Sequence, residues 1–284
     1  MTKKQHYVPQ FYMKYWLCDN GENIYYLDLK NKRTGRSYPK SICFKDCQYE
    51  IGKIRDKYVC PNKFEDEYGK LETQVSNTLR RLFPIMDKNN SAALIFFPEE
   101  KELLRKFVLT MFLRNPNLNM TSFWDDVYNT YLVPYQDVVD EVFLGYADHD
   151  MVRKIMQNIT ILPDIDKCGE DILGGMLYRK LETWVKTLRI VVLRSEDSFI
   201  FSDVPVHMEE HSIYMPLSPK YALLFGRKNI IQRSNRIYDI LYTDAMKLNR
   251  TYLNIMKDCT CNYLYAQDNE LGRRILAEIK RFIL

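Results

Sequence analysis

Segment 6–12 of this chain, His-Tyr-Val-Pro-Gln-Phe-Tyr, contains two side chains suited to acid–base or orienting chemistry. The imidazole of His6 can take up or release a proton near neutral pH. The amide of Gln10 can orient a water molecule or a carbonyl group. A histidine that directly precedes a helix is more often a cap or a surface residue, so spacing alone leaves both interpretations of His6 open.

Asp203 is the second candidate, because the surrounding run Phe-Ser-Asp-Val-Pro predicts the end of a strand followed by a turn. Pro205 biases Val204 toward extended geometry. Asp203 then lies at the end of a rigid element, a frequent position for functional carboxylates. The alternative is an Asx turn, in which the carboxylate bonds only its own backbone. The remaining histidines are interpreted as surface residues: His149, His207 and His211.

Glu65 and Glu72 are the third candidates, because they lie seven residues apart on one face of an expected helix. Glu72 falls at or inside the apolar stripe of Val75 and Leu79, where a carboxylate is costly unless it is paired. Arg114, at the end of the next expected helix, is a candidate partner. The arrangement predicts a buried ion pair between two helices, an acid whose pKa is tuned by burial, or both at once.

Motifs that would assign a cofactor or a metal are absent from the sequence. The seven cysteines are irregularly spaced and do not match the paired C-x2-C pattern of structural zinc sites. The motifs G-x-x-x-x-G-K-[ST], G-x-G-x-x-G and G-x-S-x-G are missing as well, so P-loop, Rossmann and α/β-hydrolase chemistry is not expected. We assign no metal or cofactor, although Glu72 and Asp203 together could hold Mg²⁺.

The composition is that of a soluble protein with a sizeable core: 46% of the 284 residues are apolar and 27% are charged. The net charge of +4 is too small to indicate a nucleic-acid partner by itself. Residues 1–40 are more basic, with eight Lys and Arg against three Asp and Glu, and such a lobe could face phosphate or form a solvated surface.

The cysteine count and the hydropathy pattern favour a cytoplasmic location. The number of cysteines is odd, and no hydrophobic signal stretch follows Met1. No apolar run approaches the roughly 18 residues of a membrane span. We therefore expect no membrane partner.

Helices are expected in the middle of the chain. A 3.6-residue period of apolar residues predicts a helix over 65–83. Pro98 followed by two acids predicts the start of a second helix, which Asn115-Pro116 ends. Further helices are expected over 122–131, 135–145, 151–158 and 171–187.

Strands are expected on both sides of these helices. After a short helix over 11–17, strands 24–29 and 37–42 form a hairpin around the polar stretch 30–35, and 49–51 adds a third strand. Later strands are expected over 189–194, 198–201, 213–217, 221–225 and 262–265, the first two forming a hairpin, with helices over 239–257 and 270–282. The predicted fold class is α+β, with a mixed or antiparallel sheet from N- and C-terminal strands. We expect a single domain over 1–284 with a helical subdomain at about 64–188.

The run from His6 to Trp16 resembles the opening of an uncharacterised prokaryotic and fungal domain-of-unknown-function family, which begins HYVPQFYL. Met13 stands where that family usually has Leu, and both residues are apolar and similar in volume. Softer similarities follow along nearly the whole chain, at Glu65 and Glu72, Arg114-Asn115-Pro116, Phe199 to Pro205, Pro216-Leu217-Ser218-Pro219 and Asn249. The resemblance implies that five residues converge in one site: His6, Gln10, Glu72, Arg114 and Asp203.

Hydrolysis of a phosphodiester or nucleotide is the first function hypothesis, as in a ribonuclease-like defence or toxin effector. His6 would be the general acid or base, and Asp203 or Glu72 the second group. Arg114 would stabilise phosphate charge, and tyrosine rings could stack on single-stranded RNA. The residues assigned to substrate binding are Tyr7, Tyr12, Ser202 and Asn249.

A non-catalytic regulatory module is the alternative hypothesis. The same side chains would then bind a small ligand or a partner protein without turnover, and the Tyr-rich surface would supply contact area. A third interpretation is purely structural, with His6 and Gln10 capping the amino-terminal helix and pinning it against the sheet.

Overall fold

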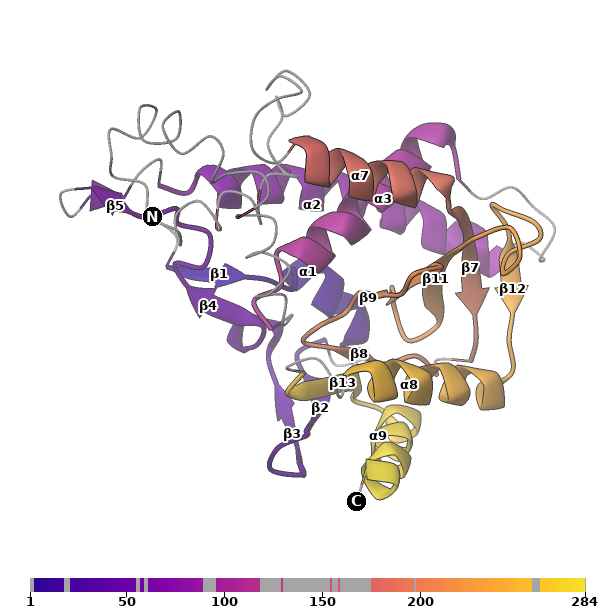
Figure 1. Ribbon diagram of the computed structural model, residues 1–284. Helices are drawn as coiled ribbons and strands as arrows, with labels where there is room; N and C mark the ends of the chain where they lie inside the picture. The colour runs from indigo at the N-terminus through magenta and orange to yellow at the C-terminus, as the bar shows by residue number, and fades with distance from the viewer. Residues whose placement is uncertain are drawn as a thin grey trace.

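The computed structural model places strands at both ends of the chain and long helices in the middle (Figure 1). It describes residues 3–17, 21–54, 57–58, 61–88, 96–117, 129, 154, 158, 175–196, 198–256 and 261–283. The fold class is therefore α+β, as the sequence predicts. The helices expected over 122–131, 135–145 and 151–158 lie outside the described residues, apart from single positions.

The larger sheet is built from the last third of the chain. Its strands are β7 Arg189–Arg194, β9 His207–Met208, β10 Ser212–Pro216, β11 Tyr221–Gly226 and β12 Ile237–Asp239. Their order is β12-β7-β11-β10-β9, with β12 parallel to β7 and the other pairs antiparallel. The strands predicted over 213–217 and 221–225 are confirmed within one residue as β10 and β11, which pair with each other.

The smaller sheet joins the two ends of the chain and is antiparallel throughout. Its strands are β2 Ile24–Asp28, β3 Arg33–Ser37, β8 Phe201–Ser202 and β13 Tyr263–Gln267, in the order β3-β2-β13-β8. Two further pairs are short: β1 Lys4–His6 with β4 Phe44–Asp46, and β5 Lys53–Ile54 with β6 Lys57–Tyr58.

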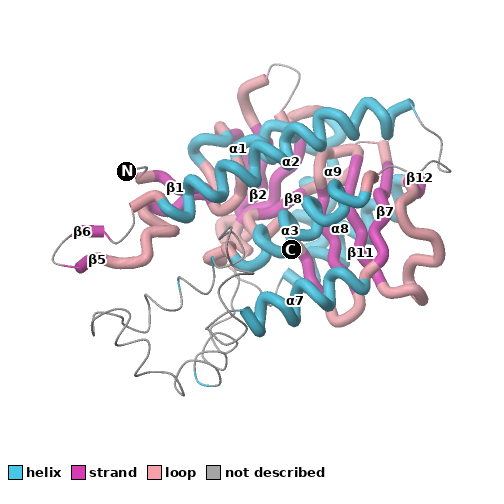
Figure 2. Tube along the Cα trace, turned by 90° about the horizontal axis from the view of Figure 1, so that it is seen from above, coloured by secondary structure: helices cyan, strands magenta, loops and turns pink. Residues whose placement is uncertain are grey.

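The helices lie on two sides of the strands. They are α1 Gln10–Met13, α2 Lys63–Lys88, α3 Pro98–Leu113, α7 Gly175–Thr187, α8 Tyr242–Met256 and α9 Glu270–Ile283. Short 3₁₀ helices occupy η1 Lys14–Trp16 and η2 Pro39–Ser41. In Figure 1, α2, α3 and α7 gather on one side, with α8 and α9 on the opposite side. Figure 2 looks onto the first side and shows the long α2 lying across the strands.

The main core is shared by the helices and both sheets, and the amino-terminal segment is part of it. Tyr12 and Trp16 are fully buried against Phe201, with ring centroids 5.4 and 4.8 Å from it. Phe201 in turn stacks on Tyr265 of β13 at 4.7 Å. The Tyr12 hydroxyl donates to the carbonyl of Pro216, 2.7 Å away. The segment that follows His6 is therefore held by strands from the end of the chain.

A second core lies between α9 and the smaller sheet. On this face of the sheet, Leu27 and Leu264 are paired across β2 and β13. They pack with Ile275 and Ile279 of α9, all buried. Because successive side chains of a strand point to opposite faces, Tyr26 of β2 and Tyr265 of β13 lie on the other face of the sheet, toward the main core. The smaller sheet therefore has one face under α9 and one face toward the amino-terminal segment.

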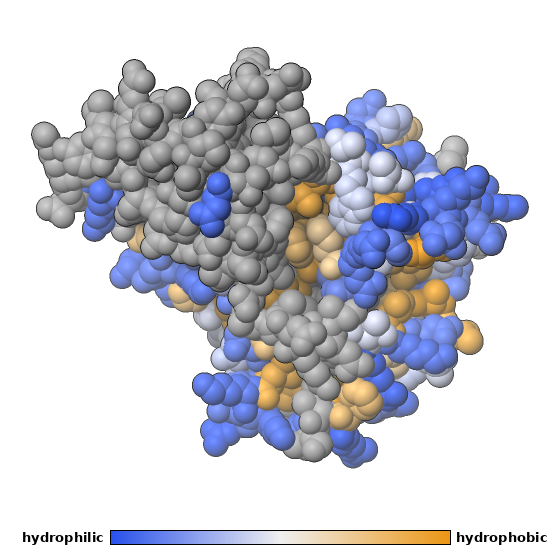
Figure 3. Space-filling view, in the orientation of Figure 1, coloured by the Kyte–Doolittle hydropathy of each residue, from blue (hydrophilic) through white to orange (hydrophobic). Residues whose placement is uncertain are grey.

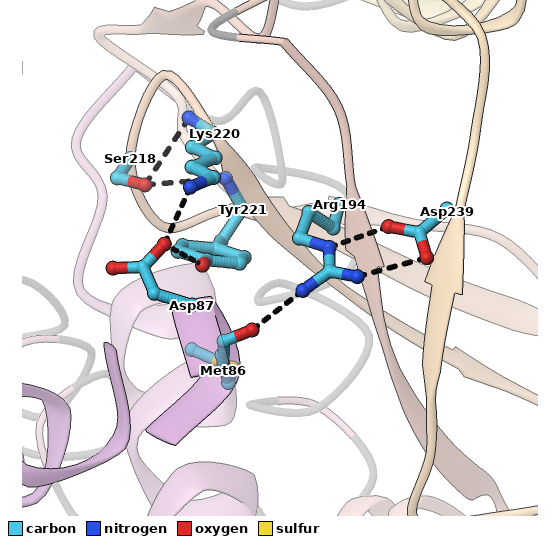
Figure 4. Close-up of polar contacts among 7 residues, drawn as sticks. All are labelled: Met86, Asp87, Arg194, Ser218, Lys220, Tyr221 and Asp239. Carbon is cyan, nitrogen blue, oxygen red and sulfur yellow. Dashed lines mark hydrogen bonds and ion pairs between the residues drawn. The ribbon is translucent and has the colours of Figure 1, made fainter. Parts of the chain in front are cut away.

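The carboxyl end of α2 is attached to the larger sheet by polar contacts (Figure 4). Asp87 accepts hydrogen bonds from Lys220 Nζ and the Tyr221 hydroxyl, both at 2.5 Å. Arg194 of β7 binds the Asp239 carboxylate through two nitrogens and donates to the carbonyl of Met86 at 2.6 Å. These groups are partly exposed, so we interpret the cluster as an attachment of α2 to the sheet.

Two predictions for the amino-terminal strands are wrong. The second strand of the hairpin is Arg33–Ser37 instead of 37–42, because the chain turns earlier: the Asn31 N–H donates to Asp28 Oδ1 at 2.9 Å and Lys32 adopts a φ of 52°. Pro39 instead begins a 3₁₀ helix, since it has no N–H to give to a sheet. Residues 49–51 form no strand, and β4 pairs with β1 just before them.

Two predictions near the carboxyl terminus are also wrong. Residues 189–194 and 198–201 form no hairpin, because β7 pairs with β11 and β12, whereas Phe201 begins β8 and pairs with β13. The helix expected over 239–257 begins at Tyr242, because Ile237–Asp239 forms the parallel strand β12. The helices expected over 65–83 and 270–282 and the amino-terminal helix are confirmed within a few residues.

Candidate functional site

His6 and Gln10 contact each other at the start of α1. Pro9 caps this helix, so Gln10 is its first residue. Gln10 Nε2 lies 3.4 Å from His6 Nδ1 and donates to it when the imidazole carries its proton on Nε2. His6 Nε2 is shielded from solvent, and no described residue offers it a hydrogen bond of ordinary geometry. Burial lowers the pKa of His6, and the backbone of Pro39 and Lys40 opposes this. A neutral His6 can therefore orient the Gln10 amide.

Gln10 lies on an open cleft with a volume of about 450 Å³. The cleft is lined by Gln10, Lys14, Leu17, Gly21, Glu22, Tyr38, Pro39 and Lys40. The Tyr38 ring is 46% exposed, with Lys40 Nζ 5.6 Å from its centre. The cleft thus combines two ammonium groups, one carboxylate and an exposed aromatic ring, a set that suits a small phosphorylated ligand.

Glu72 and Arg114 form the ion pair that the apolar stripe predicts. Arg114 Nη1 lies 2.9 Å from Glu72 Oε1, and the arginine side chain is only 1% exposed. The guanidinium lies over the Tyr68 ring, 4.6 Å from its centre. Its Nη2 contacts Met111 Sδ at 3.1 Å. Arg114 is therefore occupied inside the protein, between α2 and the end of α3.

Glu65 lies two turns before Glu72 on the same helix. Burial raises the pKa of Glu65 to about 7, and the negative charge of Glu72 adds to the rise. Burial also raises the pKa of Glu72, while Arg114 opposes that rise by charge and by hydrogen bonding. The two carboxylates thus have different surroundings, one paired with arginine and one titrating near neutral pH. Such a difference is a feature of acid–base sites and also of structural charge clusters.

Asp203 is 1% exposed and is held by partners from other parts of the chain. Its carboxylate accepts the backbone N–H groups of Asn262 at 3.2 Å and Tyr263 at 3.3 Å. Asn117 Nδ2 donates to Asp203 Oδ2 and to the Tyr7 hydroxyl, both at 3.1 Å. Burial raises the pKa of Asp203, and the surrounding donors oppose the rise. The carboxylate therefore ties β8 to β13 and to Tyr7 and does not form the alternative local Asx turn.

The residues after α3 connect two of these groups. Arg114 points to Glu72, whereas Asn115 Nδ2 donates to the backbone carbonyl of Asp203 at 2.7 Å. Asn117 completes the link to Tyr7, the neighbour of His6. Among the described residues, however, no hydrogen bond or ion pair joins His6 to Asp203 or to Glu72. The five candidate catalytic residues therefore belong to three hydrogen-bonded groups, although Arg114 is near enough to His6 for its charge to lower the His6 pKa.

The other predicted substrate-binding residues are buried and support the fold. Tyr12 belongs to the core described above. Ser202 Oγ accepts the N–H of Val204 at 3.0 Å and so stabilises the turn after β8. Asn249 is fully buried on α8 and donates to the carbonyl of Ser198 at 2.8 Å. Tyr7 is linked to the candidate residue Asp203 through Asn117.

Several residues around these groups were not predicted. Lys14 shares the Gln10 face of the amino-terminal helix because it follows four residues later, so its place on the cleft could have been anticipated. Lys40 lies in the 3₁₀ helix η2 and Asn117 in the turn after α3, and neither position carries such a local signal. Cys43 lies beside Tyr265, with Sγ donating to the hydroxyl at 3.6 Å. Burial raises the pKa of this thiol, which makes it a poor nucleophile.

The part of the chain that the structure describes contains no group of three or more His, Cys, Asp or Glu side chains able to hold a metal ion. Among the helices it describes, none is both long enough and apolar enough to cross a bilayer.

Comparison with known proteins places this chain in a family. A family model described as a protein of unknown function (DUF4238) matches residues 4–270. No curated protein and no solved structure gives a significant match. The matched range contains all three polar groups and the cleft. The chain therefore belongs to the DUF4238 family, in agreement with the domain-of-unknown-function family that its amino-terminal motif resembles.

Proposed function

We propose that this protein is a hydrolase of a phosphodiester or nucleotide whose substrate binds in the cleft beside Gln10. The observation that carries the proposal is the contact between His6 Nδ1 and Gln10 Nε2 at the wall of a cleft that also contains Lys14 and Lys40. This arrangement fixes an amide group next to two cations, which is the combination needed to orient a phosphate ester.

Each residue of the cleft has its own role in the proposed hydrolysis. Lys14 and Lys40 bind phosphate oxygens and stabilise the charge that develops on them. Gln10 orients the attacking water, and Glu22, the carboxylate of the cleft lining, accepts its proton. His6 is a positioning residue, because its Nδ1 holds Gln10 and its Nε2 is shielded from solvent.

Purified wild-type protein should cleave at least one substrate among pooled RNA, tRNA and nucleotides. Lys14→Ala and Gln10→Ala should each lower kcat/KM by roughly a hundred-fold, the usual effect of removing one group that stabilises developing charge. Lys45→Ala is the matched control, since Lys45 is exposed in the same lobe but does not line the cleft. Equal cleavage by all four proteins would refute the assignment of the cleft.

The positioning role of His6 can be tested separately through kcat, KM and the pH–rate profile. His6→Ala should lower kcat with little change in KM, because the lysines that bind the phosphate remain. A pH–rate profile should show no step at the pKa of a free imidazole, since His6 is neutral at pH 7 and transfers no proton in this scheme. Unchanged kcat in His6→Ala would remove His6 from the mechanism.

A non-catalytic binding module is the second candidate, and the shielding of Arg114 and His6 Nε2 from solvent favours it. Neither group can then touch a ligand as a catalyst. In this case the wild-type protein cleaves none of the substrates, yet calorimetry detects nucleotide binding that Lys14→Ala weakens and Lys45→Ala leaves unchanged.

A further inference from the structure

The hairpin of β2 and β3 extends away from the body of the molecule (Figure 1). Residues 28–36 contain four cationic side chains and one carboxylate. Lys30, Lys32 and Arg33 are exposed, and none of them forms an ion pair with another described residue. Arg36 is different, because it binds Asp268 at 2.6 Å. The surface around this hairpin is predominantly hydrophilic (Figure 3).

Two tyrosine rings accompany these cations on one face of the smaller sheet. Tyr26 and Tyr263 meet edge to face, with ring centroids 5.9 Å apart, and Tyr263 is 37% exposed. The ladder pairs Tyr263 with Asp28 and Asp28 with Arg33, so all three lie in one row across the sheet. The Asp28 carboxylate is bonded to the backbone and side chain of Asn31. An exposed ring therefore lies one strand away from the carboxylate and two strands away from the Arg33 guanidinium, whose charge acts on Asp28.

Gly35 makes room for the Tyr26 ring. It lies opposite Tyr26 in the ladder, and a Cβ atom at this position would come within 2.6 Å of the Tyr26 hydroxyl. The Tyr26 ring thus lies over the backbone of β3 at Gly35, half-buried against the main core. In this position it supports the exposed Tyr263 ring edge to face.

The same edge strand leads to the cleft. β3 ends at Ser37, and the next residues, Tyr38 and Lys40, line the cleft. Gly35 and Tyr38 are three residues apart, which corresponds to about 10 Å along an extended chain. Exposed tyrosines with neighbouring cations therefore occur at two places: Tyr263 lies beside Asp28 near the turn of the hairpin, and Tyr38 lies at the cleft beside Lys40. A single nucleotide would need only the cleft, whereas a repeated arrangement suits a polymer of nucleotides.

We infer that Tyr26, Lys30, Lys32, Arg33 and Tyr263 form a platform that binds single-stranded nucleic acid and directs it toward the cleft. A base stacks on the exposed Tyr263 ring, which the half-buried Tyr26 ring supports, and the lysines and arginine contact phosphates. Stacking tolerates any base, so the platform binds with little sequence preference. The direction toward the cleft rests on the proposed function, but binding to the platform does not. An acidic protein segment would bind the cationic side chains but would not require the tyrosine rings.

Fluorescence anisotropy with a labelled oligouridine measures this binding. Tyr263→Ala should weaken it by about five-fold or more, given the roughly 1–3 kcal/mol that a stacked base contributes. Tyr263→Phe keeps the ring and should bind like wild type. Tyr238→Ala is the matched control, because Tyr238 is also 37% exposed but lies on β12 of the other sheet. The backbone N–H and carbonyl of residue 263 form the hydrogen bonds with Asp203, so these bonds remain possible in both the alanine and the phenylalanine variant.

Salt dependence tests the phosphate contacts. Lys32→Ala should reduce the slope of log K against log salt by about 0.7, the value for one phosphate contact on a single strand. A duplex of the same length should bind more weakly than the single strand, because paired bases cannot stack on the rings.

The outcomes separate this inference from the proposed function. No oligouridine binding, or equal binding by wild type and Tyr263→Ala, overturns the platform even if nucleotides are hydrolysed. Ring-dependent binding without any cleavage supports the platform and overturns the hydrolase. Binding that falls with Lys32→Ala but is indifferent to Tyr263→Ala overturns the platform as well, since it reveals a purely electrostatic surface that an acidic protein could also occupy.

Discussion

Arg114 carries its charge beneath the protein surface with Glu72 as its ion-pair partner, and the energetic meaning of this pair can be measured. Its guanidinium is shared among a carboxylate, a methionine sulfur and the face of Tyr68. Glu72 keeps 25% of its side chain exposed, so water can partly replace the arginine if it is removed. The pair therefore resembles neither a fully buried ion pair nor a surface one.

Arg114→Met should lower the free energy of unfolding by about 2 kcal/mol, less than the usual cost of unpairing a buried charge because Glu72 remains partly hydrated. The double variant Arg114→Met with Glu72→Gln should recover part of this loss in urea unfolding. Arg274→Met is the control, since its pair with Glu278 is on the surface, where ion pairs contribute little to stability. If the double variant is no more stable than Arg114→Met alone, packing on Tyr68 explains the loss instead of charge.

Glu65 predicts a dependence of stability on pH. The folded state raises the pKa of Glu65 to about 7, so the native protein binds this proton more tightly than the unfolded chain does. The contribution of Glu65 to stability is therefore greatest below its unfolded pKa and is lost as the pH rises to about 7. Glu65→Gln cannot lose a proton, so it should be more stable than wild type at pH 8 by on the order of 1 kcal/mol, a value reduced by solvent screening of this partly exposed group.

Thermal unfolding of wild type and Glu65→Gln at pH 5 and pH 8 checks this prediction. The two proteins should differ less at pH 5, where the Glu65 carboxyl of the folded wild type is protonated. Glu182→Gln is a suitable control, because Glu182 lies on α7 outside this cluster. A difference between wild type and Glu65→Gln that is the same at both pH values would contradict the assigned pKa.

At the scale of elements, the amphipathic helices follow from their apolar spacing, but their placement depends on a few close contacts. The start of α9 is one of these. The Gly272 N–H donates to Asn269 Oδ1 at 2.7 Å, and a Cβ atom at position 272 would lie 2.0 Å from the carbonyl oxygen of Gln267. This carbonyl belongs to β13, so α9 and the smaller sheet approach each other as closely as a glycine permits.

Gly272→Ala should therefore destabilise the protein by about 1–3 kcal/mol, the usual range for overpacking against a backbone that cannot move easily. Gly69→Ala in α2 should instead stabilise the protein. No atom lies within 4 Å of a Cβ at that exposed helical position, and alanine is favoured over glycine there by roughly 0.5–1 kcal/mol. Urea unfolding of both variants measures the difference, and a neutral Gly272→Ala would show that α9 can shift away from β13.

At the scale of the whole molecule, the amino-terminal segment is held in place by the carboxyl-terminal third. Tyr12 donates to Pro216, 204 residues away, and packs against Phe201. Gln267 Nε2 likewise donates to the carbonyl of Leu17 at 3.0 Å. The cleft lies on this segment, so its geometry depends on the completed fold of both ends of the chain.

Tyr12→Phe should cost about 1–2 kcal/mol of stability, because the buried carbonyl of Pro216 loses its hydrogen bond while the ring packing remains. Tyr238→Phe removes a hydroxyl that bonds the Arg233 carbonyl at an exposed position and should cost much less. Chemical unfolding monitored by far-ultraviolet circular dichroism compares them. Equal losses in the two variants would indicate that the Tyr12 hydroxyl does not fix the segment.

The parts of this protein that depend on contacts between near neighbours could be predicted from the amino-acid sequence. The apolar period of 65–83 and the proline and acids at 98–100 specify α2 and α3, because a helix forms its hydrogen bonds within four residues. The same period placed Glu72 on the core side and so predicted its pairing with Arg114.

The pairing of strands and the contacts between distant polar groups could not be predicted from the sequence and follow from the folded structure. β8 pairs with β13 and β7 with β12 across gaps of tens of residues, and no local pattern distinguishes these partners from the hairpin expected at 189–201. Asn117, in the turn after α3, joins Tyr7 to Asp203, and Lys40, in the 3₁₀ helix η2, reaches the cleft, and both positions depend on how the surrounding elements pack. A strand satisfies its backbone groups only through a partner elsewhere in the chain, so these contacts follow from the folded whole.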